Sequence, residues 1–183
     1  KGLSPLAGAH PLETWCKGLE GLAERTAEYY ERGARFAKWR AVITIGEGIP
    51  SRACLEVNAH ALARYAALCQ EAGIVPIVEP EVLMDGNHSL DTCFEETEET
   101  LSIIFHELFK QGVMLEGMIL KPNMVISALD CPEQASVKEV ADATVECFLR
   151  VVPSAVPGTC FLSGGQSELA ATQHLNAMNA MND

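Results

Sequence analysis

The sequence predicts an α/β protein built around a parallel sheet, and three observations indicate this class. Segments with the apolar period of an amphipathic helix alternate with short apolar runs along the 183 residues. Strands that alternate with single helices are joined by right-handed crossovers and form a parallel sheet. The runs are short and apolar, as expected for strands buried on both faces. Hydrophobic residues make up 48% of the chain, which is enough for a substantial core.

Five segments carry the helix period or clear helix start and stop signals. Gly33 and Gly73 follow the first two segments and stop them, and Ser167 opens the last one. The fourth begins with a capping box, in which Ser136 stands three residues before Glu139. The expected helices are residues 18–32, 51–73, 90–111, 136–151 and 167–178.

Four short apolar runs separate these helices and are expected to be strands. They cover residues 34–45, 74–80, 115–121 and 158–163. The outer face of the third helix carries Glu95, Glu96, Glu98 and Glu99. Polar residues opposite an apolar stripe are typical of a solvated helix surface, so we assign no function to this acidic cluster.

Polar side chains recur at or near the C-terminal end of each expected strand. They are Lys38 and Arg40, Glu79 and Glu81, Lys121 and Asn123, and Ser163. The spacings between successive members of one series are 41, 42 and 42 residues, and the series is Lys38, Glu79, Lys121 and Ser163. This near-constant spacing predicts βα units that each place a polar group at the same height. A doubly wound sheet binds its ligand at a switch point, whereas a (β/α)8 barrel builds its site from many strand ends at one rim. The recurrence therefore favours the barrel.

Eight units of this length need roughly 340 residues, which lies within the size range of such barrels. We therefore expect residues 1–183 to be the central part of a single (β/α)8 barrel domain, cut at both ends and holding four consecutive βα units. A chain of this length would hold about half of the strands that a closed barrel needs.

Charge, cysteine usage and hydropathy exclude several classes of function. The chain has 13 basic and 25 acidic residues and a net charge of −12, which argues against nucleic-acid and anionic membrane surfaces. No apolar run approaches the roughly 18 residues of a membrane span. The seven cysteines lack CxxC spacing and favour a cytoplasmic protein with reduced thiols. The five histidines lack HxxxH spacing, so no metal site is expected.

The residue types at the predicted rim suit imine chemistry. Burial and a neighbouring cation disfavour a charged amine, so a lysine close to Lys38 and Arg40 can act as a nucleophile on a carbonyl and form a Schiff base. Lys121 fits this role because apolar residues flank it. Glu79 or Glu81 can move the protons, and the pattern leaves open which one is protonated. A plain interior ion pair is the alternative, but it needs only two of these side chains.

Ser163, Gly164 and Gly165 lie after an expected strand and before an expected helix. Glycines allow close approach to a backbone whose N–H groups are free at a helix N-terminus, so this loop suits a phosphate. An ordinary tight βα turn is the alternative. Its position on the same rim as the lysines favours a phosphorylated carbonyl compound as the ligand.

Four motifs in this order and spacing resemble the class I fructose-bisphosphate aldolases. They are FAKWR at 36–40, IVPIVEPE at 74–81, LKPNM at 120–124 and FLSGGQS at 161–167. The likeness runs from residue 5 to residue 177. The resemblance implies a cytoplasmic homotetramer of (β/α)8 barrels that needs no metal and no bound cofactor. It also implies reversible cleavage of fructose 1,6-bisphosphate into dihydroxyacetone phosphate and glyceraldehyde 3-phosphate, a step of glycolysis and gluconeogenesis.

The same resemblance implies a role for each side chain at the catalytic centre. Lys121 is the expected Schiff-base lysine, and the substrate is held covalently as an imine on it, without a cofactor. Glu79 is the expected main acid and base, while Glu81 positions the lysine and a water molecule. Lys38 steadies charge at the bond that breaks.

The phosphate contacts follow from the resemblance as well. Arg40 would contact the phosphate of the aldehyde half, and Ser163, Gly164 and Gly165 would hold the ketose phosphate. The expected partner is therefore a small phosphorylated sugar, with neither nucleic acid nor membrane. Two alternatives stay open: another imine-forming barrel enzyme such as a transaldolase, or a truncated, non-catalytic interaction or scaffold product. The 183-residue chain alone is expected to be inactive.

Overall fold

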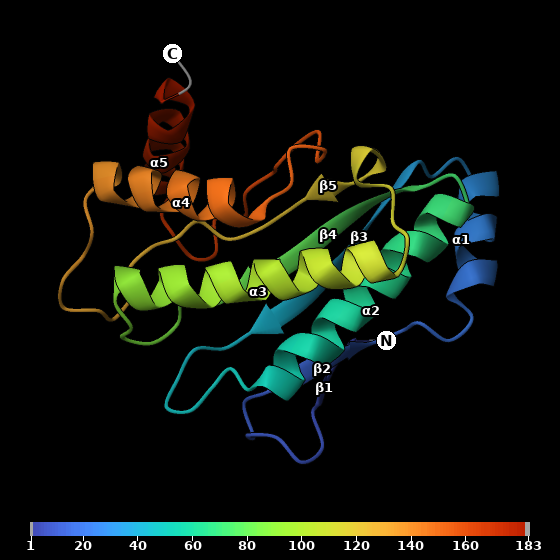
Figure 1. Cartoon of the computed structure of the whole chain (residues 1–183), viewed down its shortest axis with the longest axis horizontal. Helices are drawn as coiled ribbons and strands as arrows, with labels where there is room; N and C mark the ends of the chain where they lie inside the picture. The colour runs from blue at the N-terminus through green and yellow to red at the C-terminus, as the bar shows by residue number, and fades with distance from the viewer. Residues whose placement is uncertain (1, 182–183) are drawn as a thin grey trace.

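A computed structural model describes residues 2–181 of the chain (Figure 1). In chain order its elements are β1 (Gly2–Pro5), β2 (Thr14–Lys17), α1 (Leu22–Glu31), β3 (Phe36–Ile43), α2 (Arg52–Glu71), β4 (Val75–Val82), α3 (Leu90–Lys110), a 3-10 turn (Leu115–Gly117), β5 (Ile119–Leu120), α4 (Val137–Val151) and α5 (Glu168–Ala180). The five expected helices are all present. Within residues 2–181, no helix combines the length and apolar character that a membrane crossing requires.

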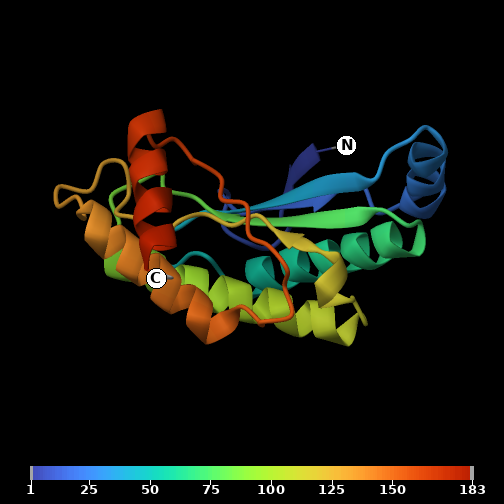
Figure 2. The ribbon, with the colours of Figure 1, turned by 90° about the horizontal axis from the view of Figure 1, so that it is seen from above.

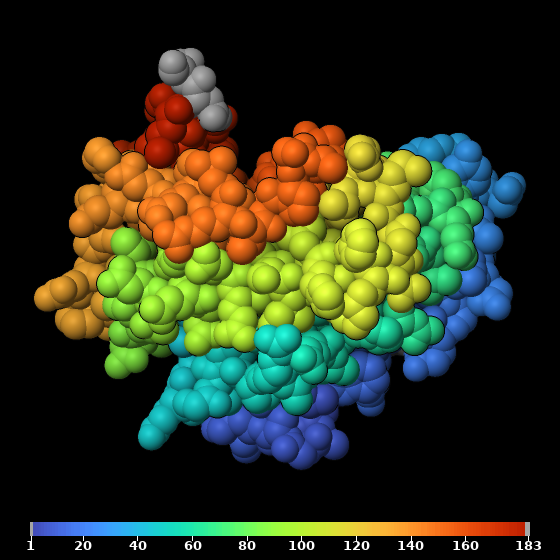
Figure 3. Space-filling view, viewed as in Figure 1, coloured from blue at the N-terminus to red at the C-terminus, as the bar shows by residue number. Residues whose placement is uncertain are grey.

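The sheet is parallel, as predicted, with strand order β3-β4-β5. Helices α2 and α3 cover one side of it (Figure 2). Helix α5 packs against α4 and stands out from the rest of the molecule in the space-filling view (Figure 3). Because the three strands run the same way, their C-terminal ends meet at one edge of the sheet, which is where the polar residues gather.

The expected fourth strand, at 158–163, forms only in part. Cys160 N–H donates to the carbonyl of Leu120 (2.9 Å), and Leu162 N–H donates to that of Pro122 (3.1 Å), so the segment runs alongside β5. Only one bridge, between Leu120 and Thr159, is regular. The physical reason is Pro122, which has no N–H to return the next bond of the ladder.

The expected strand at 115–121 is also shorter than predicted. Its first part is the 3-10 turn, and only Ile119–Leu120 pairs in the sheet. The side chain of Gln70 on α2 holds the preceding residue, Met114, by bonds to both its N–H (3.0 Å) and its carbonyl (2.8 Å). These bonds fasten the segment to α2 before it reaches the sheet.

Two N-terminal features differ from the prediction. The short antiparallel hairpin of β1 and β2 was not predicted, because four-residue strands are too short to give a clear alternation. Helix α1 begins at Leu22 rather than at residue 18, since Gly21 takes a left-handed conformation (φ +62°) at its N-cap. The capping box at Ser136 is confirmed, with the Ser136 and Glu139 side chains each accepting the other's backbone N–H.

The main core lies between the sheet and the helices α2 and α3. Tyr65 is fully buried there, and its hydroxyl donates to the carbonyl of Ala37 on β3 (2.5 Å). Four cysteines on helices are buried and free: Cys54, Cys69, Cys93 and Cys147.

The acidic face of α3 is only partly a solvated surface. Glu95 and Glu99 are exposed, whereas Glu96 and Glu98 are half-buried. Arg52 on α2 pairs with Glu99 at 3.4 Å, and an arginine on α4 pairs with Glu98 at 3.3 Å. Two of the four glutamates therefore link α3 to its neighbouring helices.

Candidate active site

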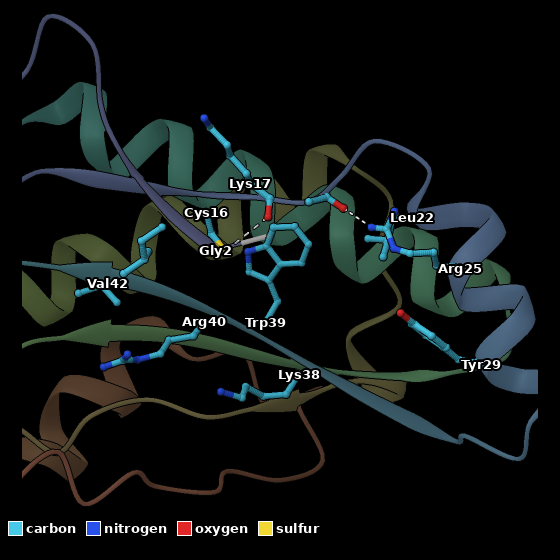
Figure 4. A pocket seen from close by; sticks show the side chains of 12 residues that line it. Gly2, Cys16, Lys17, Leu22, Arg25, Tyr29, Lys38, Trp39, Arg40 and Val42 are labelled. Carbon is cyan, nitrogen blue, oxygen red and sulfur yellow. Dashed lines mark hydrogen bonds between the residues drawn. The ribbon is translucent and has the colours of Figure 1, made fainter.

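The parallel strands bring the predicted catalytic side chains to one side of the sheet. Lys38 and Arg40 come from β3, Glu79 and Glu81 come from β4, and Lys121 follows β5 directly. Side chains alternate along a strand, so residues two apart share a face. Figure 4 shows the result on β3, where Lys38 and Arg40 extend away from the intervening tryptophan, which points toward the N-terminal hairpin. The β3 residues, but not Glu79, Glu81 or Lys121, border a cavity of about 530 Å³ that the N-terminal hairpin and α1 also line.

Glu79 is the centre of this group. Lys38 Nζ lies 2.8 Å from Glu79 Oε2, and Lys121 Nζ lies 2.9 Å from Glu79 Oε1. The Glu79 side chain is 4% exposed, whereas that of Lys121 is 29% exposed. Burial acts to raise the pKa of Glu79, but the hydrogen bonds and charges of the two lysines outweigh it, so the pKa lies below its ordinary value. Glu79 is therefore an ionised carboxylate at neutral pH, within proton-transfer distance of two amines.

A second ion pair joins Arg40 to Glu81, whose side chain is also buried. The hydrogen bond to Glu81 raises the pKa of Arg40 despite partial burial, so the guanidinium keeps its charge. A guanidinium presents several donors in a planar fork, and one carboxylate does not use them all. Arg40 can therefore contact a further anion while it stays held by Glu81.

The strand register shows how the 41-residue recurrence places two polar groups at one height. Lys38 pairs in the sheet with Ile77, and Arg40 pairs with Glu79, so Lys38 and Glu79 are not register partners. Both ion pairs instead run diagonally, from a β3 residue to a β4 residue two positions beyond its partner. Strands in a barrel are tilted, so residues at equal height belong to different register positions. Lys38 and Glu79, expected at one height, are therefore in contact although they lie two positions apart in the sheet register.

Glu79 and Lys121, by contrast, lie in register. Val78 pairs with Leu120, and the N–H of Lys121 donates to the carbonyl of Val78 at 2.8 Å. Glu79 follows Val78, and Lys121 follows Leu120, so these two residues lie side by side and make direct contact. Here the 42-residue spacing corresponds to the actual pairing of β4 with β5.

Asn123 does not join the site, although the strand alternation predicted that it shares a face with Lys121. The chain leaves the regular strand at Leu120, so the alternation ends there. The Asn123 side chain is buried, accepts from the N–H of Val82 (3.1 Å) and donates to Thr97 Oγ1 (3.0 Å). It fastens the end of β4 to α3 and has a structural role.

The loop from Ser163 to Gly165 leads directly into α5. Gly164 and Gly165 have φ values of +59° and +96°, in the region that favours glycine. A Cβ atom on Gly164 would lie 1.9 Å from the Cε atom of Met84, so a larger residue would have to displace the end of that side chain. Met84 is a buried residue of the loop after β4, and no motif indicated its contact with this turn. The bond from Leu162 N–H to the carbonyl after Lys121 brings the loop alongside the lysine.

Within residues 2–181, no three histidine, cysteine, aspartate or glutamate side chains are grouped so that they could hold a metal ion. The polar centre is instead built from three cations and two carboxylates. An arrangement in which one buried carboxylate contacts two amines can transfer protons to and from an amine. It can also stabilise negative charge that develops on a carbonyl compound.

Comparisons with known proteins agree with this geometry. A family model described as fructose-bisphosphate aldolase class-I matches residues 1–183. A probable fructose-bisphosphate aldolase class 1 of Xanthomonas campestris is 60% identical over 181 residues, which cover 99% of this chain and 54% of the relative. The fructose-bisphosphate aldolase of Dictyostelium discoideum is 52% identical over 183 residues, covering 99% and 51% respectively.

A solved structure gives the same result. The fructose-bisphosphate aldolase of Plasmodium falciparum, crystallised with TRAP and a small-molecule inhibitor, superposes with a TM-score of 0.97 at 47% identity. The match covers 99% of this chain and 52% of that one. The chain thus spans about half the length of the relatives it matches, and the predicted fold class, about half of a (β/α)8 barrel, is confirmed. The chain belongs to the class I fructose-bisphosphate aldolase family.

Proposed function

We propose that residues 1–183 are the central part of a single aldolase-type barrel domain. The complete protein cleaves fructose 1,6-bisphosphate reversibly to dihydroxyacetone phosphate and glyceraldehyde 3-phosphate, in glycolysis and gluconeogenesis. One observation carries the proposal: a buried carboxylate, Glu79, contacts two lysines, of which Lys121 directly follows a strand at the rim. Family membership supports the choice of a phosphorylated ketose over the substrates of a transaldolase.

Lys121 forms the imine. Its ammonium first loses a proton, for which Glu79 Oε1 at 2.9 Å is the nearest acceptor. The free amine attacks the C2 carbonyl of the ketose to give a carbinolamine. Glu79 then returns the proton to the carbinolamine hydroxyl, which leaves as water, and a protonated imine remains. The ionised state of Glu79 suits the first of these steps, since a base must begin without the proton.

Cleavage follows from the same arrangement. A base takes the proton of the C4 hydroxyl, the C3–C4 bond breaks, and its electron pair moves to the imine nitrogen as an enamine. We assign this base to Glu79, which is buried and close to the imine nitrogen. Lys38, 2.8 Å from the other oxygen of Glu79, steadies the negative charge that develops on the C4 oxygen. Protonation of the enamine at C3 and hydrolysis of the imine then release the ketose phosphate and regenerate Lys121.

Glu81 and Arg40 act together in this scheme. Glu81 is buried and holds Arg40, whose free donors contact the phosphate of the aldehyde half. From the same position Glu81 orders the water beside the imine lysine. Ser163, Gly164 and Gly165 hold the ketose phosphate through the hydroxyl and backbone N–H groups of the loop that precedes α5.

The wider properties of the enzyme belong to the same proposal. Its partner is a small phosphorylated sugar, and neither nucleic acid nor membrane takes part. The reaction uses no metal and no cofactor other than the imine on Lys121. The complete protein is a cytoplasmic homotetramer, and residues 1–183 alone are inactive because the rim is incomplete.

Reductive trapping tests the assignment of Lys121. The complete protein is mixed with dihydroxyacetone phosphate and borohydride, and the modified lysine is located by peptide mass spectrometry. We expect the label on Lys121, its loss in Lys121→Ala and its retention in Lys110→Ala, a matched change at an exposed lysine of α3. A label that persists on another lysine in Lys121→Ala would show that the imine forms elsewhere.

A further inference from the structure

A buried histidine on α5 is connected to the glycine loop through one glutamine. His174 Nδ1 lies 2.6 Å from Gln166 Oε1, and Gln166 Nε2 donates to the carbonyl of Ser163 at 3.0 Å. The backbone N–H of Gln166 donates to the same carbonyl at 3.2 Å. None of the rim motifs contains His174, which is seven residues beyond the last one.

The hydrogen-bond chemistry fixes the direction of this chain of contacts. The Ser163 carbonyl can only accept, so Gln166 must turn its Nε2 toward the loop and its Oε1 toward the histidine. His174 must therefore carry a proton on Nδ1. Burial lowers the pKa of His174, which favours the neutral Nδ1–H form. The protonated ring also donates from Nδ1, so the contact persists in both charge states.

The loop needs such support because of its glycines. Gly164 and Gly165 are consecutive residues with positive φ, and glycine has more backbone freedom to lose on ordering than any other residue. Met84 contacts Gly164 from the side of β4. The bond from Gln166 holds the carbonyl of Ser163, at the other end of the turn. A loop held at two points keeps its backbone N–H groups in place before a ligand arrives, which lowers the entropic cost of binding.

We propose that His174 is a positioning residue that orders the Ser163–Gly165 loop through Gln166 for binding of a phosphate group. This rests on the proposed function in one respect, the assignment of the ketose phosphate to the loop. His174 touches no reacting atom. Its effect is on the affinity for the phosphorylated substrate and not on the bond-breaking steps.

The test uses three variants of the complete protein. His174→Leu removes the donor, His174→Asn keeps an amide N–H close to the position of Nδ1, and Gln173→Leu is a matched control at an exposed position of α5. Loss of one buried hydrogen bond predicts a KM for fructose 1,6-bisphosphate about tenfold higher in His174→Leu. We expect kcat to change less than twofold, and His174→Asn and Gln173→Leu to keep the KM of the unchanged protein.

Amide hydrogen exchange of residues 163–166 gives a readout that does not depend on catalysis. We expect faster exchange of these amides in His174→Leu than in Gln173→Leu, with His174→Asn restoring the slow rate. Unchanged exchange, or a lower kcat and melting temperature with an unchanged KM, would overturn the positioning role. An unchanged protein that neither cleaves the sugar nor traps dihydroxyacetone phosphate would overturn the proposed function instead, while the exchange rates still decide whether His174 orders the loop.

Discussion

Gly164→Ala is the substitution whose cost the structure defines most sharply. Two separate effects act at this position. The backbone has a φ of +59°, where a residue with a Cβ atom is strained, and the new Cβ would lie 1.9 Å from Met84 Cε. An ordinary contact begins at 3.4 Å, so the two atoms must separate by about 1.5 Å. Met84 is buried, which limits the room into which its methyl group can move.

The expected loss of stability follows from these two effects. A left-handed backbone costs a residue other than glycine about 1 kcal/mol. Overpacking of a dense interior costs roughly 1–3 kcal/mol, and the flexible end of a methionine favours the lower half of that range. We therefore expect Gly164→Ala to lower the free energy of unfolding by about 2–3 kcal/mol. In a Met84→Ala background the clash with Met84 disappears, while the backbone strain and a 2.9 Å approach to Leu162 Cδ1 remain, so the cost should fall to about 1–2 kcal/mol.

Urea unfolding of the complete protein can separate the two effects in a double-mutant cycle of Gly164→Ala with Met84→Ala. Gly112→Ala is the matched control, because Gly112 has a φ of +71° and nothing within 4 Å of its added Cβ. It should show the backbone cost alone. If Gly164→Ala costs the same with and without the Met84 side chain, the packing argument is wrong and backbone strain explains the whole effect.

Two further predictions concern the ion pairs and the helix caps. The pKa of Glu79 is lowered in the folded protein from 4.5, so its pairing stabilises the fold above that pH, and the stabilisation is lost as pH falls through the folded-state value. We expect Glu79→Gln to be less stable at pH 7 and to lose less stability than the unchanged protein between pH 5 and 3, measured by urea midpoints. Ser136→Ala removes the capping box with Glu139 and should cost about 1 kcal/mol in thermal unfolding. A control at an exposed mid-helix position, Ser102→Ala, should be close to neutral, and equal effects would contradict the capping argument.

Long amphipathic segments made most of the fold predictable from the sequence. Helix α3 was expected at 90–111 and spans Leu90–Lys110, because Ser89 caps its start and a long apolar stripe packs on the sheet. Short elements were not predictable in the same way. The start of β5 depends on Gln70, and the incomplete pairing of residues 158–163 depends on Pro122; both act on parts of the chain far away in sequence and leave no local period. The β1–β2 hairpin is too short for alternation to identify it.

The same distinction applies to the site. Charged residues at the ends of apolar strands are unusual enough to be recognised one by one, so Lys38, Glu79 and Lys121 were predicted together and lie in contact. Residues that act through ordinary packing or through hydrogen bonds of a side-chain amide do not stand out in the sequence in this way. Met84 and Gln166 support the glycine loop, and only the three-dimensional arrangement reveals their contacts with it.

The distribution of burial explains how an acidic protein can hold an anionic ligand. The chain has a net charge of −12, yet the rim combines three cations with two carboxylates. The carboxylates are 4% and 7% exposed, whereas the side chains of the cations are 29–45% exposed. The negative groups are therefore more deeply buried than the positive ones and hold them in place, while the side chains of the cations stay partly exposed. In the function proposed above, a phosphorylated ligand that approaches this rim would meet these cations, and the buried Glu79 carboxylate that holds two of them is the group able to move a proton.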